Sequence, residues 1–265
     1  MKDFKTKWVL VTGASSGLGA AMATDLALTH QFNLILVARR KENLERLAAN
    51  IESQSLVHLK IIQADLADSD DLRRVIDECL FCPHFYGAVL NAGMTYLGEY
   101  IHHPLKHQLS IIQLNIQATV QLTDAFVKHF EKTGDEGRLM VISSLAAKVP
   151  APYQSVYSGS KAFITNFYHS LKHELQNRKL KLSVFSPGGI KTEMTQDAGF
   201  RDMEKYLMPV EEASKLAVKT FINGSHDFIP GLGNRIGIAL LSFLPTRIIS
   251  RLMGKKYYKS IKSNN

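Results

Sequence analysis

A tyrosine and a lysine four residues apart form the most informative pair in this chain. Tyr157 and Lys161 lie within Tyr157-Ser158-Gly159-Ser160-Lys161, and in a helix this spacing places both side chains on one face. A free tyrosine has a pKa near ~10 and is a poor base at neutral pH. A cation at about 4 Å, with an effective dielectric constant of ~20, favours the phenolate by up to roughly 4 kcal/mol. At about 1.36 kcal/mol per unit, this predicts a pKa of Tyr157 lowered by as much as ~3 units, which suits proton transfer near pH 7.

A glycine-rich turn near the start of the chain predicts a phosphate-binding site. The apolar run Trp8-Val9-Leu10-Val11 is followed by Thr12-Gly13-Ala14-Ser15-Ser16-Gly17-Leu18-Gly19 and then by an amphipathic stretch. In a strand–turn–helix unit, glycines let the backbone approach a pyrophosphate, which binds amides at the positive end of the helix. The spacing G-x-x-x-G-x-G differs from the usual dinucleotide pattern G-x-G-x-x-G, and taken alone it is also compatible with an ordinary turn.

Together the two motifs resemble the short-chain dehydrogenase/reductase family, over about residues 7–224. The likeness rests on five stretches in the family's order, namely Thr12–Gly19, Asp65, Asn91-Ala92-Gly93, Ser144 with Tyr157 and Lys161, and Pro187-Gly188. Asn115, in Leu114-Asn115-Ile116, matches the family's fourth catalytic position. The resemblance implies hydride transfer by a nicotinamide cofactor. The protein would position the reactants and transfer the proton.

The resemblance also assigns roles to the catalytic residues. It makes Tyr157 the acid/base on the substrate oxygen and Ser144 a hydrogen-bond donor to the same atom, so these two residues also bind substrate. Lys161 is expected to hold the nicotinamide ribose and to lower the pKa of Tyr157. Asn115 is expected to place a water that links Lys161 to solvent. Ser144 is preferred over Ser143 because its separation from Tyr157 matches the family, and adjacent strand residues point to opposite faces.

The end of the second predicted strand indicates which nicotinamide cofactor is bound. An NAD site requires an acidic side chain there to hold two ribose hydroxyls. This chain has Ala38 at that position, followed by Arg39 and Arg40, and arginines suit the 2′-phosphate of NADP(H). The alternative is that both arginines begin a solvated helix. The predicted cofactor-binding residues are Gly13, Ser15, Ser16, Gly17, Leu18, Gly19, Arg39, Arg40, Asp65, Leu66, Asn91, Ala92, Gly93, Tyr157, Lys161, Pro187, Gly188, Ile190 and Thr192.

Alternating apolar runs and helical patterns predict an α/β fold with a single Rossmann-type, doubly wound parallel sheet and helices on both faces. The expected strands are Val9–Thr12, Asn33–Ala38, Leu59–Gln63, Gly87–Leu90, Arg138–Ser143, Leu182–Phe185 and a short one at Phe228–Pro230. The expected helices are Leu18–Leu28, Lys41–Gln54, Ser69–Leu80, a pair within Pro104–Lys132, Val156–Asn177 and Pro209–Asn223. Ligands are expected at the carboxyl ends of the strands.

Size, charge and cysteine content limit the classes of protein to which this chain can belong. With 265 residues, 45% of them hydrophobic, the chain suits one catalytic domain over 1–227 and a basic C-terminal extension over 228–265. The polar start and the absence of a long apolar run favour the cytoplasm. The pair Cys79 and Cys82 is interpreted as reduced thiols in a helix-to-strand connection, and no metal site is predicted. His102, His103 and His107 are interpreted as a solvated loop leading into a helix.

The substrate is predicted from the residues around the catalytic positions. Met94, Tyr96, Leu145, Val149, Pro150, Tyr153 and Gln154 flank the site, and the loop from Glu193 to Pro209 carries Met194, Phe200, Met203, Tyr206, Leu207 and Met208. This mostly apolar set favours a small lipophilic ketone, aldehyde or secondary alcohol over a sugar or a small acid. Packing of the same residues onto the domain is the alternative.

The end of the chain is basic and amphipathic. After Asp227 the sequence has seven cations and no acid, and Arg247, Arg251 and Lys255 recur every four residues. Such a segment could lie on an anionic membrane surface from the cytoplasmic side, or it could dock on the domain and close the substrate pocket. Nucleic-acid binding is not expected, because the charge is terminal and lacks interleaved aromatic residues.

The sequence therefore predicts an NADP(H)-dependent oxidoreductase with Tyr157 as its acid/base. An NADP-binding scaffold or sensor with weak turnover, peripheral to a membrane, is the alternative. The intact Ser144, Tyr157 and Lys161 favour the enzyme. The resemblance further implies a homodimer or homotetramer formed through the helices near Asn115–Lys132 and Val156–Asn177.

Overall fold

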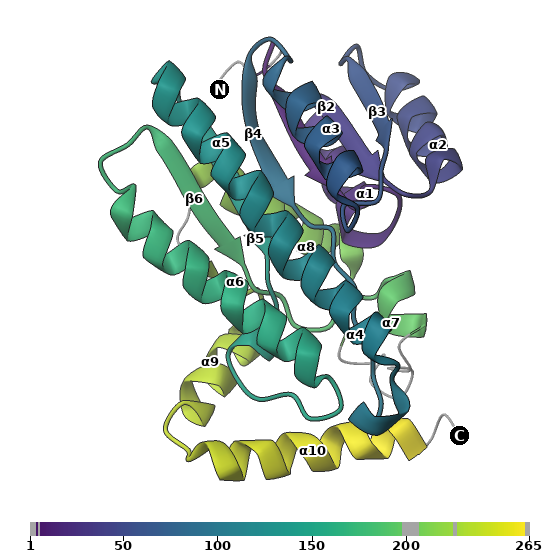
Figure 1. Ribbon diagram of the computed structural model, residues 1–265, viewed down its shortest axis with the longest axis vertical. Helices are drawn as coiled ribbons and strands as arrows, with labels where there is room; N and C mark the ends of the chain where they lie inside the picture. Colours follow the sequence, from purple (N-terminus) through teal and green to yellow (C-terminus); the bar gives the residue numbers. More distant parts are fainter. Residues whose placement is uncertain (1–3, 5, 198–206, 225–226, 263–265) are drawn as a thin grey trace.

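Seven parallel strands form one sheet in the computed structural model, which describes residues 4, 6–197, 207–224 and 227–262 (Figure 1). The strands are β1 (Trp8–Thr12), β2 (Asn33–Ala38), β3 (Leu59–Gln63), β4 (Phe85–Leu90), β5 (Gly137–Ile142), β6 (Leu180–Phe185) and β7 (Asp227–Phe228). Their spatial order is β3-β2-β1-β4-β5-β6-β7. The order reverses at β1, so a crevice for ligands is expected beyond the carboxyl ends of β1 and β4.

Helices cover both faces of the sheet because each central strand is apolar on both sides. Val9 and Val11 of β1 pack with α1 (Gly17–Leu28), α2 (Lys41–Glu52) and α8 (Val210–Asn223). Leu10 lies on the opposite face, in the cluster formed with α3 (Ser69–Leu80), α5 (Thr119–Thr133) and α6 (Ser155–Glu174). The predicted doubly wound α/β fold is therefore confirmed.

The predicted pair of helices within Pro104–Lys132 is a nearly continuous helical rod. A short 3₁₀ turn, η1 (Tyr100–His102), precedes α4 (Leu105–Ile112), which runs into the π-helical segment η2 (Gln113–Ala118) and then into α5. A π-helical segment within a longer helix often marks a functional site. Asn115, one of the predicted catalytic residues, lies in this segment.

The C-terminal extension forms two helices beyond the carboxyl edge of the sheet. α9 (Leu232–Leu241) and α10 (Thr246–Lys262) follow β7, and α10 runs across the lower end of the molecule in Figure 1. Two short elements, η3 (Leu145–Ala147) and α7 (Glu193–Asp197), complete the layer between the sheet and these helices. Among the described residues, the structure contains no helix with the length and apolar character needed to cross a membrane.

Candidate active site

One large cavity lies at the carboxyl edge of the sheet. Its volume is about 1170 Å³, and it is lined by residues that follow β1, β2, β3, β4, β5 and β6, together with the inner faces of α9 and α10. Pockets for drug-sized ligands typically measure ~300–1,000 Å³, so this cavity has room for a dinucleotide and a second molecule. All the predicted site residues line it except Gly19 and Asn115, which are buried behind its surface.

The turn after β1 needs glycine at three positions for different reasons. Gly13 and Gly17 have φ angles of +67° and +54°, a conformation that side chains rarely adopt. A Cβ atom on Gly19 would lie 2.2 Å from the carbonyl oxygen of Gly13, so this glycine allows α1 to approach the end of β1. Gly19 therefore shapes the turn without lining the cavity, and α1 begins at Gly17 with its free amides at the cavity.

The two arginines after β2 lie at the cofactor end of the cavity. The Arg40 guanidinium donates to the Ser16 hydroxyl at 2.6 Å and to both the Ser15 hydroxyl, at 3.4 Å, and a carboxylate oxygen of Glu193, at 3.1 Å. Arg39 lies 3.9 Å from the carboxylate of Asp65, after β3. The arginines are thus attached to the glycine turn and the adjacent strand end, where the adenosine part of a dinucleotide would bind.

The residues after β4 are fixed by the first strand. The Thr12 hydroxyl accepts hydrogen bonds from the backbone amides of Asn91 and Ala92, at 2.9 and 3.0 Å. The side-chain amide of Asn91 in turn donates to the carbonyl oxygen of Thr12, at 3.0 Å. These bonds hold the backbone of Gly93 beside Asn115 and Lys161, so the middle of the cavity is rigidly connected to β1.

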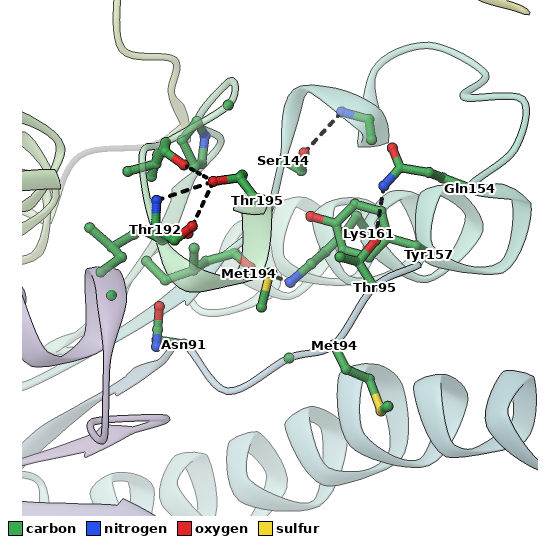
Figure 2. Close-up of a pocket in the computed structure, with 18 of the residues that line it drawn as sticks. Asn91, Met94, Thr95, Ser144, Gln154, Tyr157, Lys161, Thr192, Met194 and Thr195 are labelled. Carbon is green, nitrogen blue, oxygen red and sulfur yellow. Dashed lines mark hydrogen bonds between the residues drawn. The ribbon is translucent and has the colours of Figure 1, made fainter. Parts of the chain in front are cut away.

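The predicted catalytic residues converge on the same cavity (Figure 2). Tyr157 is in the first turn of α6, Lys161 lies one turn later, and Ser144 follows β5 at the start of η3. The Ser144 hydroxyl oxygen accepts from the amide of Ala146 at 3.1 Å, which leaves the hydroxyl proton to be donated to the Tyr157 oxygen. The neighbouring Ser143 hydroxyl is 2.6 Å from that of Thr165, inside the core. The two serines therefore point to different partners, as alternation along a strand requires.

Electrostatics around Tyr157 differ from the expectation. Burial raises the pKa of Tyr157, and a hydrogen bond with the Ser144 side chain opposes this effect. Burial lowers the pKa of Lys161 to about 8. The Lys161 ammonium donates to the carbonyl oxygen of Ile142 at 2.8 Å and lies 5.8 Å from the centre of the Tyr157 ring. Lys161 is therefore directed towards the end of β5, and the expected lowering of the Tyr157 pKa is absent.

Asn115 is 1% exposed and its side chain is fully used in local hydrogen bonds. Its amide nitrogen donates to the Met94 carbonyl oxygen at 3.1 Å and to the Ser160 hydroxyl at 3.0 Å, and its amide oxygen accepts from the Met94 backbone at 3.0 Å. Asn115 thus ties α6, which carries Tyr157 and Lys161, to the loop after β4. Any water placed by Asn115 must use its backbone, which lies in the π-helical segment.

The segment after β6 closes the cavity over the glycine turn. Pro187, Gly188, Ile190 and Thr192 line the cavity, and the Thr192 methyl group lies within 3.2 Å of where a Cβ on Gly17 would stand. The Thr195 hydroxyl fixes this segment by donating to the carbonyl oxygens of Ile190 and Thr192, both at 2.8 Å (Figure 2). Met194 and Leu207 also line the cavity, whereas Phe200, Met203 and Tyr206 lie outside the described residues.

Several predictions about the substrate end need correction. Met94, Tyr96, Leu145, Val149 and Gln154 line the cavity as expected, but Pro150 and Tyr153 do not. Tyr153 instead stacks on Tyr258 of α10, with ring centres 6.0 Å apart. The predicted solvated histidine loop is wrong for His103 and His107, which line the cavity, and the His103 ring lies 4.1 Å from that of Tyr96.

The C-terminal helices line the cavity, in agreement with the expected alternative that this segment docks on the domain and closes the substrate pocket. Gly233, Asn234, Gly237, Ile238 and Leu241 of α9 and Met253, Tyr257 and Ile261 of α10 line the cavity. Their spacing of three and four residues was visible in the sequence as an amphipathic pattern. The pattern alone left docking on the domain and contact with a membrane both open, and it did not identify which residues line the cavity.

Comparisons with known proteins agree with this arrangement. A family model described as short chain dehydrogenase matches residues 7–204. The 17-beta-hydroxysteroid dehydrogenase type 3 of Rattus norvegicus is 28% identical over 265 residues, covering 97% of this chain and 84% of the relative. The 11-beta-hydroxysteroid dehydrogenase 1A of Arabidopsis thaliana is 31% identical over 234 residues, and the alignment covers 82% of this chain and 65% of that relative's length.

A solved structure shows the same fold with a cofactor bound. The short-chain dehydrogenase from Sphingobium yanoikuyae in complex with NADPH has a TM-score of 0.81 and 29% sequence identity. The match covers 90% of this chain and 96% of that one. The family match, the parallel sheet and the converging strand ends lead to one conclusion. This chain belongs to the short-chain dehydrogenase/reductase family of nicotinamide-dependent oxidoreductases.

Proposed function

We propose that this protein transfers a hydride between NADP(H) and a lipophilic ketone, aldehyde or secondary alcohol. The observation that carries the proposal is one cavity with the glycine turn and Arg40 at one end and Ser144, Tyr157 and Lys161 at the other. A bound nicotinamide cofactor would supply or accept the hydride. The residues of this chain would orient the substrate oxygen and move its proton.

Tyr157 and Ser144 are the groups proposed to act on that oxygen. Because burial raises the pKa of Tyr157, its phenol is protonated at neutral pH and can donate a proton to an oxygen that gains negative charge. The Ser144 hydroxyl, held in place by the Ala146 amide, donates a second hydrogen bond to the same oxygen. In the direction of alcohol oxidation, the phenolate form of Tyr157 would accept the hydroxyl proton of the alcohol, and the Ser144 hydroxyl would stabilise the negative charge left on the oxygen.

Lys161 and Asn115 are proposed to support this proton transfer. The ammonium of Lys161 is held by a backbone carbonyl oxygen and can exchange this partner for the hydroxyls of the cofactor ribose. Such a move brings a positive charge closer to Tyr157 and favours its phenolate. Asn115 holds α6 against the loop after β4, and its backbone lies in the π-helical segment, where a carbonyl group could bind a water.

The preference for NADP(H) is proposed from the end of β2. Ala38 presents no carboxylate to the ribose hydroxyls, and Arg39 and Arg40 provide two guanidinium groups within the same part of the cavity. Guanidinium groups bind phosphate oxygens through charged, geometrically matched hydrogen bonds. Arg40 already donates hydrogen bonds to the serines of the glycine turn, which supports a role for its guanidinium in binding a 2′-phosphate.

A bulky lipophilic substrate is proposed from the walls of the other end. Leu145, Val149, Ile238, Leu241 and Met253 surround the space next to Ser144 and Tyr157. Two relatives are named as hydroxysteroid dehydrogenases, which supports a polycyclic or similarly bulky ketone or alcohol. A homodimer or homotetramer through α5 and α6 is part of the same proposal.

A substrate panel tests the proposed function. Oxidation of NADPH would be followed at one cofactor concentration with ketones and aldehydes graded by ring number and chain length. We expect kcat/KM to increase from acetone-sized to polycyclic ketones, because each buried methylene adds about 0.8 kcal/mol to binding. Highest activity with sugars or short hydroxy acids would contradict the proposed substrate class. No turnover with any carbonyl or alcohol would favour a cofactor-binding scaffold.

A peripheral position on an anionic membrane is proposed from the outer faces of α9 and α10. Seven large apolar side chains of these helices and of the turn between them are between 38% and 85% exposed, namely Leu232, Ile236, Leu240, Phe243, Leu244, Ile248 and Leu252. Arg235, Arg247, Arg251 and Lys255 lie in the same helices, and no acid follows Asp227. An amphipathic surface of this charge matches an interface with anionic lipids.

Vesicle flotation tests this position with matched variants. Leu240→Ser with Phe243→Ser should lower binding to vesicles of phosphatidylcholine and phosphatidylglycerol at least ~10-fold. Leu56→Ser with Phe81→Ser removes equally exposed apolar side chains elsewhere and should leave binding unchanged. Release at high salt is expected because screening shortens to ~3 Å at 1 M. No binding of the wild-type protein, or dimerisation through this surface instead, would refute the proposal.

A further inference from the structure

The C-terminal helix α10 brings a second tyrosine to the reacting end of the cavity. Tyr257 lines the same cavity as Ser144 and Tyr157, although 100 residues separate the two tyrosines. Burial, together with the nearby Tyr157, raises the pKa of Tyr257 to about 12. Tyr257 is therefore a neutral phenol at any pH at which the protein works, and it can donate a hydrogen bond without giving up its proton.

The helix that carries Tyr257 is fixed against the loop that leads into α6. Gly254 packs on Pro152, where a Cβ on the glycine would lie 3.7 Å from the proline ring. On the other side of Tyr257, the ring of Tyr258 stacks on that of Tyr153. About two turns before Tyr257, Ile249 is 6% exposed and anchors the start of the helix. These contacts set the rotation of α10 and place Tyr257 on its inner face.

Tyr257 also differs from its neighbours in chemistry. Among the described α9 and α10 residues that line the cavity, Asn234 and Tyr257 are the ones with polar side chains, and the others are glycine or aliphatic. The Asn234 amide donates to the carbonyl oxygen of Pro230 at 2.9 Å, which fixes the start of its own helix. Tyr257 thus places a phenol group in a part of the cavity wall that is otherwise apolar, and near enough to Tyr157 for Tyr157 to raise its pKa.

We propose that Tyr257 is a substrate-binding residue whose hydroxyl donates a hydrogen bond to the reacting oxygen, beside Ser144 and Tyr157. This inference rests on the proposed oxidoreductase function. A carbonyl oxygen that gains negative charge during hydride transfer can accept more hydrogen bonds than the ground-state carbonyl. A donor placed beside this oxygen therefore stabilises the transition state more than the bound ketone. The ring of Tyr257 at the same time limits the space beside the reacting carbon.

Two substitutions distinguish the role of the Tyr257 hydroxyl from that of its ring. Tyr257→Phe keeps the ring and removes the donor, and it should lower kcat and kcat/KM together by roughly 10-fold. Tyr257→Ala also opens the wall, and it should improve the relative kcat/KM for ketones with larger substituents. The Kd of NADPH, measured by fluorescence, should stay within about two-fold of wild type in both variants, because the contact is with substrate.

Tyr258→Phe is the matched control, since it is the adjacent tyrosine of the same helix and is directed at Tyr153. Its kcat/KM should equal that of wild type. Equal kcat/KM in Tyr257→Phe and wild type across the carbonyl panel would overturn the proposal, even if Tyr257→Ala were impaired. The same holds for equal losses in Tyr257→Phe and Tyr258→Phe, which would indicate a purely structural role. A wild-type protein without turnover would instead refute the proposed function on which this inference rests.

Discussion

Arg40 and Glu193, 153 residues apart in the sequence, form an ion pair across the cofactor end of the cavity, with both guanidinium nitrogens 3.1 Å from one carboxylate oxygen. The pair joins the end of β2 to α7, which begins the segment that closes the cavity. About half of each side chain is exposed. A pair of this kind is typically worth ~0.2–1 kcal/mol, so a bound phosphate can displace the carboxylate.

We therefore expect Glu193→Gln to tighten NADPH binding. Removing the carboxylate frees the Arg40 guanidinium for the 2′-phosphate, and the Kd of NADPH should fall by up to about five-fold while that of NADH changes less. Titration calorimetry measures both values. Glu45→Gln, which breaks an exposed ion pair with Lys41 at 3.5 Å, is the control and should change neither. Weaker NADPH binding in Glu193→Gln would show that the carboxylate helps to build the site.

A second prediction concerns the choice between the two cofactors. Ala38→Asp combined with Arg39→Ala should shift the preference towards NADH, because it adds a partner for the ribose hydroxyls and removes a partner for the phosphate. Each lost charged contact should cost about 1.5–3 kcal/mol, or roughly 10- to 150-fold in affinity for NADPH. Arg46→Ala, on the exposed side of α2, should leave the preference unchanged. Equal affinities of the wild-type protein for NADH and NADPH would already refute the assignment.

The buried ammonium of Lys161 predicts a pH-dependent stability. Its pKa falls from 10.5 to about 8 on folding, so between these values the unfolded chain binds more protons than the folded one. The free energy of unfolding of the cofactor-free protein should therefore rise with pH over this window, by up to about 3 kcal/mol, relative to Lys161→Met. Urea unfolding at pH 7 to 10.5 measures the difference, and the exposed Lys179→Met serves as control. Parallel curves for wild type and Lys161→Met would show that the ammonium is not desolvated.

The sequence was sufficient to predict the sheet and its strand-end residues for a physical reason. Each predicted position follows a run of apolar residues, and a parallel sheet brings the carboxyl ends of such runs to one edge. Strand boundaries differ by one or two residues, as at β5, which is Gly137–Ile142 in the structure and was predicted as Arg138–Ser143. Short, buried strands carry no marker in the sequence that separates their last residue from the loop.

The parts that could not be predicted depend on packing between distant segments. Tyr257 resembles any aromatic residue on an amphipathic helix until its helix is placed on Pro152 and Tyr153. The direction of Lys161 was also missed, because its spacing from Tyr157 places it on the right face but does not reveal the carbonyl oxygen of Ile142 as its partner. His103 was assigned to solvent for the same reason, since its contact with Tyr96 depends on how the loop folds back over the cavity.

The most direct test of the account is the activity of Tyr157→Phe, which removes the proposed proton donor and keeps the ring. With wild-type Kd for NADPH, this variant should lose 10²–10⁴-fold in kcat with the best ketone of the panel, because acid–base catalysis typically contributes that much. Thr165→Ser, which keeps the buried hydroxyl beside Ser143 and lies two turns further along α6, controls for general damage to this helix. An undiminished kcat in purified Tyr157→Phe would contradict the central claim that this phenol exchanges the proton with the substrate oxygen.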